Sequence, residues 1–465
     1  MSEQEEAFRD HISTVDEKGK RIWIFPKKPK GSYYNKRKIL SYFLIALLFG
    51  APHIKIGGEP MLLFNIIERK FVILGKVFWP QDLYLFALMM IIGVVFVILF
   101  TIIFGRLFCG WVCPQTIFME MLFRRIEYWI DGDWTEQKKL DKAPWNANKI
   151  FKRALKHFIF WIISFLIANT FLAYIIGADE LFKIQISNPS HHIGGLIAIT
   201  VFTYAFYGVF AFLREQVCTT ICPYGRLQGV LLDKNSMVVA YDNVRGEDRA
   251  KIRKDENRKE AKKGDCIDCG HCVHVCPTGI DIRNGTQLEC INCTACMDSC
   301  DHMMEAVGME KGLIRIVSEN GIKNRTPFQW TKRVIAYTVL LAGMILTLSI
   351  LLITRKDFET NIIRQRGTTY QTSDDGSISN IFEVNLLNKT KTNYVITFKS
   401  VESHVKIEQV SKKIILKGGK QIKERLLIKM KNGYLDDGLK KIEVEVYGNG
   451  KLIQTIQTKF IGPLL

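Results

Sequence analysis

Long apolar blocks alternate with polar, mostly basic stretches along this chain. Five blocks approach the roughly 20 apolar residues that cross a bilayer as a helix. They are residues 39–56, 83–104, 158–176, 193–213 and 334–353. The first is the weakest, because His53 and Lys55 lie near its end. The pattern predicts five transmembrane helices. No early apolar segment precedes them, so we expect no cleaved signal peptide.

Lysine and arginine are unevenly divided among the connecting segments. They are frequent before residue 39, between the second and third blocks, and between the fourth and fifth. Residues 57–82 hold three of them and residues 178–192 hold one. Basic loops stay on the cytoplasmic side. We therefore expect the N-terminus on the cytoplasmic side and, after five spans, the C-terminus on the outer side of the membrane.

Residues 356–465 follow a different pattern, with short runs in which apolar and polar residues alternate. Residues 442–446 are one such run, and Tyr447-Gly448-Asn449-Gly450 after it is typical of a hairpin turn. About seven such strands in roughly 105 residues are typical of a β-sandwich. The segment has no cysteine and no cluster of polar residues that would indicate a catalytic site. We expect it to have a structural or partner-docking role.

The net charge of +18 follows from 64 basic and 46 acidic residues. Most of the excess lies in the segments assigned to the cytoplasmic side, where it faces the headgroups of membrane lipid. The most basic stretch, residues 245–263, is interleaved with acidic residues and has no aromatic residue for base stacking. We therefore expect no nucleic-acid partner.

The twelve cysteines are confined to residues 109–300, on or near the predicted cytoplasmic side, where thiols stay reduced. Eight follow the bacterial two-cluster ferredoxin spacing, in which three close cysteines and one distant cysteine bind each 4Fe–4S cluster. The spacing assigns Cys266, Cys269, Cys272 and Cys300 to cluster one and Cys290, Cys293, Cys296 and Cys276 to cluster two. A zinc ribbon needs only four ligands. The pattern therefore predicts two 4Fe–4S clusters that transfer single electrons.

The other four cysteines form two C-x3-C-P motifs, Cys109/Cys113 and Cys218/Cys222, separated by a constant offset of 109 residues. On a helix, positions i and i+4 share a face, so both thiols of a pair can reach one target. The proline after each pair marks a kink or a helix start. Three interpretations stay open: a Cu(I) site, redox-active dithiols, or buried inert cysteines.

The order of these parts resembles the cytochrome c oxidase accessory protein family, CcoG, also called FixG or RdxA. The resemblance is carried by Phe78-Trp79-Pro80-Gln81-Asp82 and by Cys109-Gly110-Trp111-Val112-Cys113-Pro114-Gln115-Thr116, followed by the second C-x3-C-P, the ferredoxin spacing and the β segment. It implies a multi-pass bacterial inner-membrane cupric reductase that supplies Cu(I) for the haem–copper centre of cbb3-type oxidase. The family's copper-binding and catalytic cysteines correspond to Cys109, Cys113, Cys218 and Cys222. The resemblance also implies an immunoglobulin-like C-terminal domain in the periplasm. Implied partners are a cytoplasmic electron donor, a copper chaperone or transporter, oxidase assembly factors and a second copy in a homodimer.

Together these observations predict a multidomain chain with an α-helical membrane core of five transmembrane helices, an α+β bacterial two-cluster ferredoxin domain and a C-terminal all-β immunoglobulin-like sandwich. The predicted boundaries are a basic segment 1–38, a membrane domain 39–230, the ferredoxin domain 231–331, a fifth helix 332–355 and the sandwich 356–465. Two alternative functions remain: a quinol-linked electron-transfer subunit without a copper role, and an oxidase-assembly scaffold whose clusters sense redox state.

Overall fold

The computed structural model describes residues 14–463, apart from residues 17, 19, 67–69, 253–257, 259, 366, 368, 374–375, 391, 410–412 and 436–437. The chain divides into two compact units, Met1–Leu348 and Ser349–Leu465. Each is described by itself.

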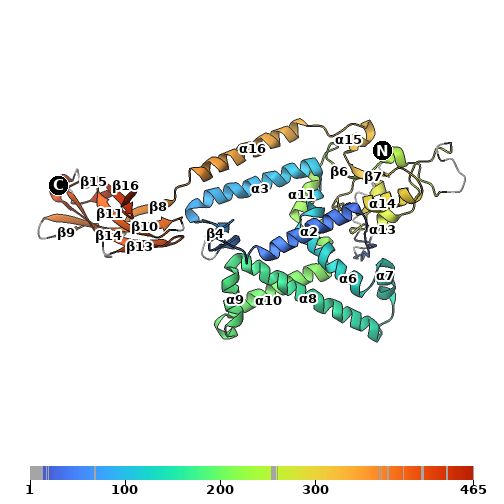
Figure 1. Ribbon diagram of the computed structural model, residues 1–465, viewed down its shortest axis with the longest axis horizontal. Coiled ribbons are helices and arrows are strands. Elements are labelled where there is room, and N and C mark those ends of the chain that lie inside the picture. The colour runs from blue at the N-terminus through green and yellow to red at the C-terminus, as the bar shows by residue number, and fades with distance from the viewer. Residues whose placement is uncertain are drawn as a thin grey trace. The chain divides into compact units, whose positions relative to one another are not determined.

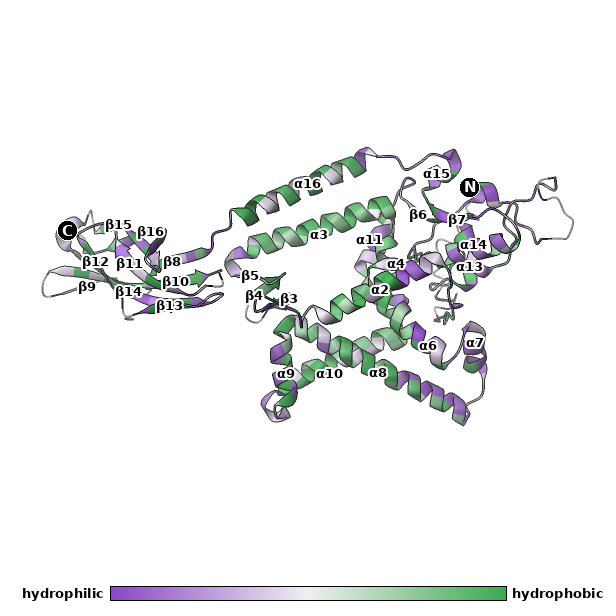
Figure 2. Ribbon diagram, in the orientation of Figure 1, coloured by the Kyte–Doolittle hydropathy of each residue, from purple (hydrophilic) through white to green (hydrophobic). Residues whose placement is uncertain are grey.

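Four helices of the described residues are long and apolar enough to cross a membrane. They are α3 (Leu83–Phe104), α8 (Ala147–Ile176), α10 (Ile193–Gly208) with its π-helical extension η5 (Val209–Leu213), and α16 (Lys332–Ile353). Figure 2 shows the apolar character along these helices. They match four of the five predicted spans, and the predicted bounds of residues 83–104 agree with α3 at both ends.

The remaining predicted span, residues 39–56, differs from the structure. Its helix, α2 (Ser32–Gly50), is shorter at its C-terminal end, and Lys55–Ile56 form strand β1 instead. Pro52 follows the helix closely and has no N–H for a helical hydrogen bond. The helix also starts earlier than predicted, so that basic residues occupy its first turns. It is therefore not among the four apolar spans.

Aromatic side chains pack the interior between these helices. Phe123 lies between Phe160, at 4.8 Å between ring centroids, and Phe210, at 4.5 Å in a stacked arrangement. All three rings are nearly inaccessible to solvent. Facing side chains of this size bury a large apolar area and fix how α8 and η5 pack. On another side of the bundle, Leu99 of α3 packs with Leu341 of α16.

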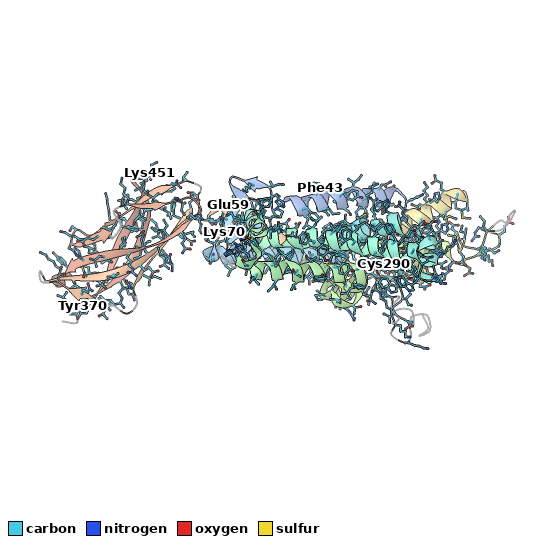
Figure 3. All side chains as sticks on the ribbon, turned by 90° about the horizontal axis from the view of Figure 1, so that it is seen from below. Phe43, Glu59, Lys70, Cys290, Tyr370 and Lys451 are labelled. Atoms are coloured by element: carbon cyan, nitrogen blue, oxygen red, sulfur yellow. The ribbon has the colours of Figure 1, made fainter. Side chains whose placement is uncertain are left out.

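Short strands and helices connect the spans. Glu59 of β2 and Lys70 of β4, labelled in Figure 3, form an ion pair of 2.8 Å in the segment between α2 and α3. The connecting elements are β1 (Lys55–Ile56), β2 (Glu59–Pro60), β3 (Leu62–Asn65), β4 (Lys70–Ile73), β5 (Lys76–Phe78), η2 (Pro80–Asp82), α4 (Leu107–Trp111), α5 (Pro114–Ile117), η3 (Phe118–Phe123), α6 (Arg124–Ile130), α7 (Trp134–Lys142), α9 (Ala178–Ile186), η4 (Pro189–His191), η6 (Val217–Ile221) and α11 (Pro223–Leu231).

The eight clustered cysteines lie in a small α+β region of the first unit. Its two antiparallel strands, β6 (Val238–Tyr241) and β7 (Ile314–Val317), pair along four residues each. The helices are α12 (Asn243–Gly246), α13 (His271–His274), η7 (Ile282–Asn284), α14 (Ala295–Ala306) and α15 (Glu319–Asn324). Met297, Met304 and Leu313 are buried among the cysteines. We call this region, residues 238–324, the ferredoxin region.

Residues 20–31, which we call the N-terminal strap, cross the ferredoxin region before α2 begins. The Lys27 N–H donates to the carbonyl of His274 at 2.7 Å. Immediately after the strap, the carboxylate of Asp298 accepts the N–H groups of Tyr33 at 3.1 Å and Tyr34 at 2.7 Å. Since these N–H groups lie in the first turn of α2, a side chain of α14 caps α2. The first helix is thereby tied to the ferredoxin region (Figure 1).

The second unit is a sandwich of two antiparallel sheets. One sheet has the order β12-β14-β10-β8, with β9 beside β10, and the other has the order β13-β11-β15-β16. The strands are β8 (Phe358–Arg364), β9 (Gln371–Thr372), β10 (Ser377–Asn388), β11 (Tyr394–Ser400), β12 (Val405–Gln409), β13 (Ile414–Leu416), β14 (Gln421–Lys431), β15 (Leu439–Gly448) and β16 (Lys451–Ile461). Alternate side chains from both sheets, such as Phe382 and Ile442, form one core.

The sandwich confirms the strand pattern read from the sequence, with nine strands among the described residues where about seven were expected. The predicted hairpin is present between β15 and β16. Asn449 and Gly450 turn the chain with φ of 50° and 81°. Two consecutive left-handed residues are the requirement of a two-residue type I′ hairpin, which Asn-Gly meets best.

Candidate functional site

The ferredoxin region contains two cysteine-lined cavities. One is lined by Cys266, Cys269, Cys272 and Cys300, together with Tyr241 and apolar side chains. The other is lined by Cys276, Cys290, Cys293 and Cys296, with Cys272 at its edge. The structure therefore brings together the two sets of four that the spacing assigned, including the exchange of Cys300 and Cys276 between the two copies. Cys290 is labelled in Figure 3.

The two cysteine loops have the same backbone conformation because they repeat the same spacing with an offset of 24 residues. Asp268 and Asn292 both have left-handed φ, of 52° and 51°. Gly270 and Thr294, two residues later, have φ of 67° and 65°. Each loop therefore turns at two left-handed residues, and its three cysteines line one cavity.

The cysteine environments fit iron–sulfur clusters. The backbone N–H groups of Thr278, Gly279 and Ile280 donate to the Cys276 sulfur. Burial raises the pKa of Cys290 to about 12, although the N–H of Asn292 opposes it. A free thiol there stays protonated at neutral pH, whereas iron binding displaces the proton and the N–H groups stabilise the resulting thiolate.

The C-x3-C-P cysteines do not lie on continuous helices, so the prediction from i,i+4 spacing was wrong in this respect. Cys109 belongs to α4, but Cys113 has an extended ψ of 124° and precedes α5. Cys222 likewise has ψ of 116° and precedes α11. The cause is the following proline, which excludes helical backbone from the residue before it. Both prolines start a new helix, as one of the two sequence interpretations expected.

Although the helices are broken, the structure brings the four thiols of Cys109, Cys113, Cys218 and Cys222 together. Cys109 interacts electrostatically with Cys113 and Cys222, and Cys218 interacts with Cys109 and Cys113. Thr116, which follows Cys113 closely in the sequence, is buried in the same region. We call these four cysteines the thiol quartet. In the described residues, no three His, Cys, Asp or Glu side chains already surround a position for a single ion.

Polar groups around the thiol quartet influence its protonation. Burial raises the pKa of Cys109, which the side-chain amide of Gln228, donating to its sulfur at 3.0 Å, opposes. Burial raises the pKa of Cys218 to about 12. A metal ion bound by these thiols would displace their protons.

Two buried guanidinium groups link the thiol quartet with the second cysteine cavity. Arg106 is 3% exposed and interacts electrostatically with Cys109 and Cys290. Arg37 is 1% exposed, donates from Nε to the carbonyl of Gly110 at 2.6 Å, and faces Cys293. Sequence reasoning assigned Arg37 to the basic surface and missed this role. Its position inside α2 rather than before it is visible only in the structure.

Direct backbone contact joins the two sites at Gly110, between Cys109 and Cys113. A Cβ atom at Gly110 would overlap the carbonyl oxygen of Ile291, which lies between Cys290 and Cys293. Cys109, Ile291 and Cys293 are buried in one cluster. The second cysteine cavity is thus the one next to the thiol quartet.

A buried network of ion pairs supports this assembly. Both terminal nitrogens of Arg214 donate to the carboxylate of Glu127 at 2.8 Å, and Lys156 bonds Asp131 at 2.7 Å. Burial alone would raise the pKa of Glu127, but Arg214 and Lys156 outweigh it and hold the pKa below its usual value. Paired in this way, the charges hold α6, α8 and the end of η5 together.

Several other histidine and methionine side chains pack against their neighbours. Met119 and Met121 are buried at 4% and 1% exposure. His157 contacts the hydroxyl of Tyr207 at 3.0 Å. His274 is exposed at the edge of the ferredoxin region and stacks on Trp134.

Comparison with known proteins agrees with this geometry. Residues 213–319 match a family model described as a 4Fe-4S dicluster domain, and residues 86–135 match a 4Fe-4S binding domain. Residues 348–463 match the IG-like fold at the C-terminus of FixG. The fold and the cysteine sites therefore define an iron–sulfur oxidoreductase with a helical core that has four candidate membrane spans.

The relatives identify the family. Protein RdxA of Cereibacter sphaeroides is 34% identical over 79% of this chain and 80% of its own length. Nitrogen fixation protein FixG of Rhizobium meliloti is 31% identical over 79% of this chain and 77% of its own. Protein RdxB of C. sphaeroides is 32% identical, with coverage of 80% on both sides. The chain belongs to the FixG/RdxA family, which confirms the resemblance inferred from the sequence.

Proposed function

We propose that this chain is a membrane-bound reductase that converts Cu(II) to Cu(I) at the thiol quartet and supplies Cu(I) for the haem–copper centre of cbb3-type cytochrome c oxidase. In this proposal Cu(II) is the substrate and gains one electron. A copper chaperone or transporter and oxidase assembly factors receive the product, and a cytoplasmic donor supplies the electron.

The observation that carries the proposal is the contact at Gly110. It places the turn between Cys109 and Cys113 directly against the loop between Cys290 and Cys293, with no side chain between the two backbones. Clusters bound in the two cysteine cavities would supply one-electron reduction. The thiol quartet lies beside the second cysteine cavity and would receive the electron from there.

The thiol quartet also has the chemistry that copper requires. Thiolates are soft ligands that favour Cu(I) over Cu(II), so they lower the energy of the reduced product relative to the substrate. The positive charge of Arg106 beside Cys109 and Cys218 offsets part of the negative charge that builds up when several thiols lose their protons.

The test is anaerobic Cu(II) reduction by a Cys109→Ser/Cys113→Ser variant, followed with a Cu(I)-specific chelator. We expect the rate to fall to the background without protein, while the iron content stays at about eight per chain and the cluster spectra are retained. Thr220→Ala, at an exposed residue of η6 between the other two cysteines, is the matched control and keeps its rate. Unchanged copper reduction in the double variant would refute the proposal.

A second candidate function, quinol-linked electron transfer, has one observation in its favour. An apolar cavity of about 200 Å³ lies beside the thiol quartet, with Val112 and Pro114, the neighbours of Cys113, in its wall. Its other lining residues are apolar apart from Tyr174. An apolar cavity of about 150 Å³ accommodates a benzene ring. The space therefore suits the ring of a membrane quinone.

Filling the cavity separates the two candidates. Leu44→Trp narrows it, whereas Phe43→Trp places the same side chain on an exposed position of α2. If quinol is the electron source, Leu44→Trp alone abolishes cluster reduction by a soluble menaquinol analogue. If the chain is a cupric reductase with a cytoplasmic donor, both variants reduce Cu(II) at the wild-type rate.

A further inference from the structure

An open groove of about 740 Å³ separates the N-terminal strap from the ferredoxin region. One side consists of the strap and the first turns of α2, and the other side consists mainly of α14. Its charged and polar lining residues are Lys27, Lys28, Lys30, Ser32, Lys36, Asp133, His271, Asp298, Ser299, Asp301, His302, Glu305 and Lys311. None of the functions considered above makes use of this groove.

The groove lies against the cysteine cavity that is remote from the thiol quartet. Ser299 and Asp301, both in its wall, are the two neighbours of Cys300, and His271 precedes Cys272. Among the twelve cysteines, all of which the structure describes, only Cys269 is exposed. It belongs to the same cavity. The groove is therefore beside the most accessible point of the electron path.

The carboxylates in the groove already have partners within the chain. Asp298 accepts the N–H groups that start α2, and Asp301 accepts the Gly312 N–H at 2.8 Å. Asp133 accepts the N–H groups of Lys28 at 3.0 Å and Trp134 at 2.8 Å. Glu305 pairs with Lys311 at 3.0 Å. The backbone hydrogen bonds hold Asp133, Asp298 and Asp301 in the wall of the groove without changing their charge, whereas Glu305 is paired with a lysine.

The lysines of the strap and of α2 are in a different situation. Within the described part of the chain, no carboxylate lies within ion-pair distance of the ammonium groups of Lys27, Lys28, Lys30 or Lys36. Lys28, Lys30 and Lys36 are exposed at the rim. Exposed ammonium groups at the rim of a concave surface attract partners of the opposite charge.

We propose that this groove is the docking site of an acidic one-electron carrier protein that reduces the ferredoxin region. The inference rests on the proposed function for the direction of electron flow. Each encounter transfers one electron: the carrier is oxidised by one electron, the ferredoxin region is reduced by one, and no proton or covalent bond changes. Complementary charge at the rim speeds association and orients the carrier toward Cys269.

The test uses photoreduced plant-type [2Fe–2S] ferredoxin as an acidic probe, mixed with the purified full chain in stopped flow. The variant Lys28→Glu/Lys30→Glu/Lys36→Glu reverses the rim charge. Lys417→Glu/Lys420→Glu/Lys451→Glu makes the same change in net charge on exposed residues of the sandwich. We expect the bimolecular rate constant to fall at least about tenfold in the groove variant and by less than about twofold in the control, with the difference shrinking at high salt.

Two further measurements distinguish weaker docking of the ferredoxin from damage to the clusters. Binding of oxidised ferredoxin, measured by titration, is expected to weaken in the groove variant, which is a readout independent of electron transfer. Photoreduced deazariboflavin, which is uncharged, is expected to reduce all three proteins equally if the clusters are intact. Equal ferredoxin rates and affinities in wild type and groove variant would overturn the proposal.

Rival anionic ligands give different outcomes. If the groove variant keeps its ferredoxin rate but loses binding to vesicles containing phosphatidylglycerol, the lysines bind lipid headgroups and the proposal is wrong. If the charge effects are as expected but Cys109→Ser/Cys113→Ser still reduces Cu(II), the docking site stands and the copper function fails. The two proposals are therefore separable.

Discussion

At the scale of single residues, the absence of a side chain at Gly110 allows the thiol quartet and the second cysteine cavity to lie in direct backbone contact. Glycine is required there by close approach and not by backbone conformation, since it lies inside α4. Its contact with Ile291 joins segments that are far apart in the sequence, at the point where the two sites meet. A side chain at this position would separate them.

Gly110→Ala tests this contact. The added methyl group overlaps the Ile291 carbonyl, so we expect slower Cu(II) reduction and a free energy of unfolding lower by about 1–3 kcal/mol. Cluster reduction by deazariboflavin is expected to stay at the wild-type rate. Gly93→Ala, where a Cβ meets nothing within 4 Å, is the control and is expected to change neither rate. Equal copper reduction in both variants would show that the contact is not on the electron path.

Glu127 illustrates how strongly a buried charge depends on its partners. Glu127→Gln removes the two short hydrogen bonds of buried Arg214 and leaves it only the more distant carboxylate of Glu215, at 3.7 Å; breaking such a pair costs about 3–5 kcal/mol. The exposed pair of Glu180 and Lys183 is the control, since Glu180→Gln is expected to cost at most about 1 kcal/mol. Thermal unfolding in detergent, followed by circular dichroism, measures both. Similar losses in the two variants would contradict the assignment.

The same residue predicts a pH dependence. The pKa of Glu127 is lower in the folded chain than in the unfolded one, so its contribution to stability is fully present above the unfolded value and is lost as pH falls through the folded value. Wild type is therefore expected to lose stability on acidification more steeply than Glu127→Gln. Melting temperatures measured between neutral and mildly acidic pH would show it, and parallel curves would contradict it.

At the scale of elements, the starts of α5, α11 and α2 are each fixed by one identifiable residue. Pro114 and Pro223 start α5 and α11 and force the preceding cysteines into extended backbone. Asp298 of α14 caps α2 from outside that helix. The two prolines thereby fix the backbone of Cys113 and Cys222, and Asp298 joins α2 to the ferredoxin region.

Asp298→Ala removes the cap of α2. Two N–H groups of the first turn then lose their acceptor, at a cost of about 0.5–2 kcal/mol. We expect faster amide hydrogen exchange at Tyr33 and Tyr34, with exchange in α8 unchanged. Glu305→Ala, also on α14 but paired only with Lys311, is the control. Unaltered exchange at the start of α2 would show that Asp298 does not hold the helix.

Elements with a strong local signal were predicted correctly, and the reason is physical. Residues 83–104 contain no charge, so the bounds of α3 follow from apolar length alone. The hairpin at Asn449 and Gly450 follows from the left-handed backbone that these residues tolerate. Around Cys113 the local rule failed because the effect of Pro114 on the preceding residue outweighs helical spacing.

At the scale of the whole molecule, the sequence predicted which cysteines belong together in the ferredoxin region but not how that region meets the thiol quartet. The roles of Arg37 and Gly110 depend on packing between segments that are distant along the chain, and no local pattern records such packing. The groove beside α14 was equally hidden, because its lysines were counted only as markers of sidedness.

Membrane sidedness remains a prediction and is directly testable. We expect Lys451→Cys, at the β15–β16 hairpin, to react in intact spheroplasts with a membrane-impermeant maleimide. Lys311→Cys, in the ferredoxin region, is expected to react only after permeabilisation. Mass spectrometry of the two labelled peptides distinguishes these engineered thiols from the native cysteines. Labelling of both sites before permeabilisation would contradict an odd number of spans.

The strap has a consequence for biosynthesis. The Lys27 N–H donates to the His274 carbonyl, and Lys27 leaves the ribosome long before His274, which is 247 positions later in the chain. At about 5–20 residues per second, the strap waits roughly 10–50 s for its partner. During that interval three of the long apolar helices are already made, while the cysteine loops are not. Since neither set of four cysteines is complete before Cys276 and Cys300 are made, we expect iron–sulfur maturation to follow the synthesis of these three helices.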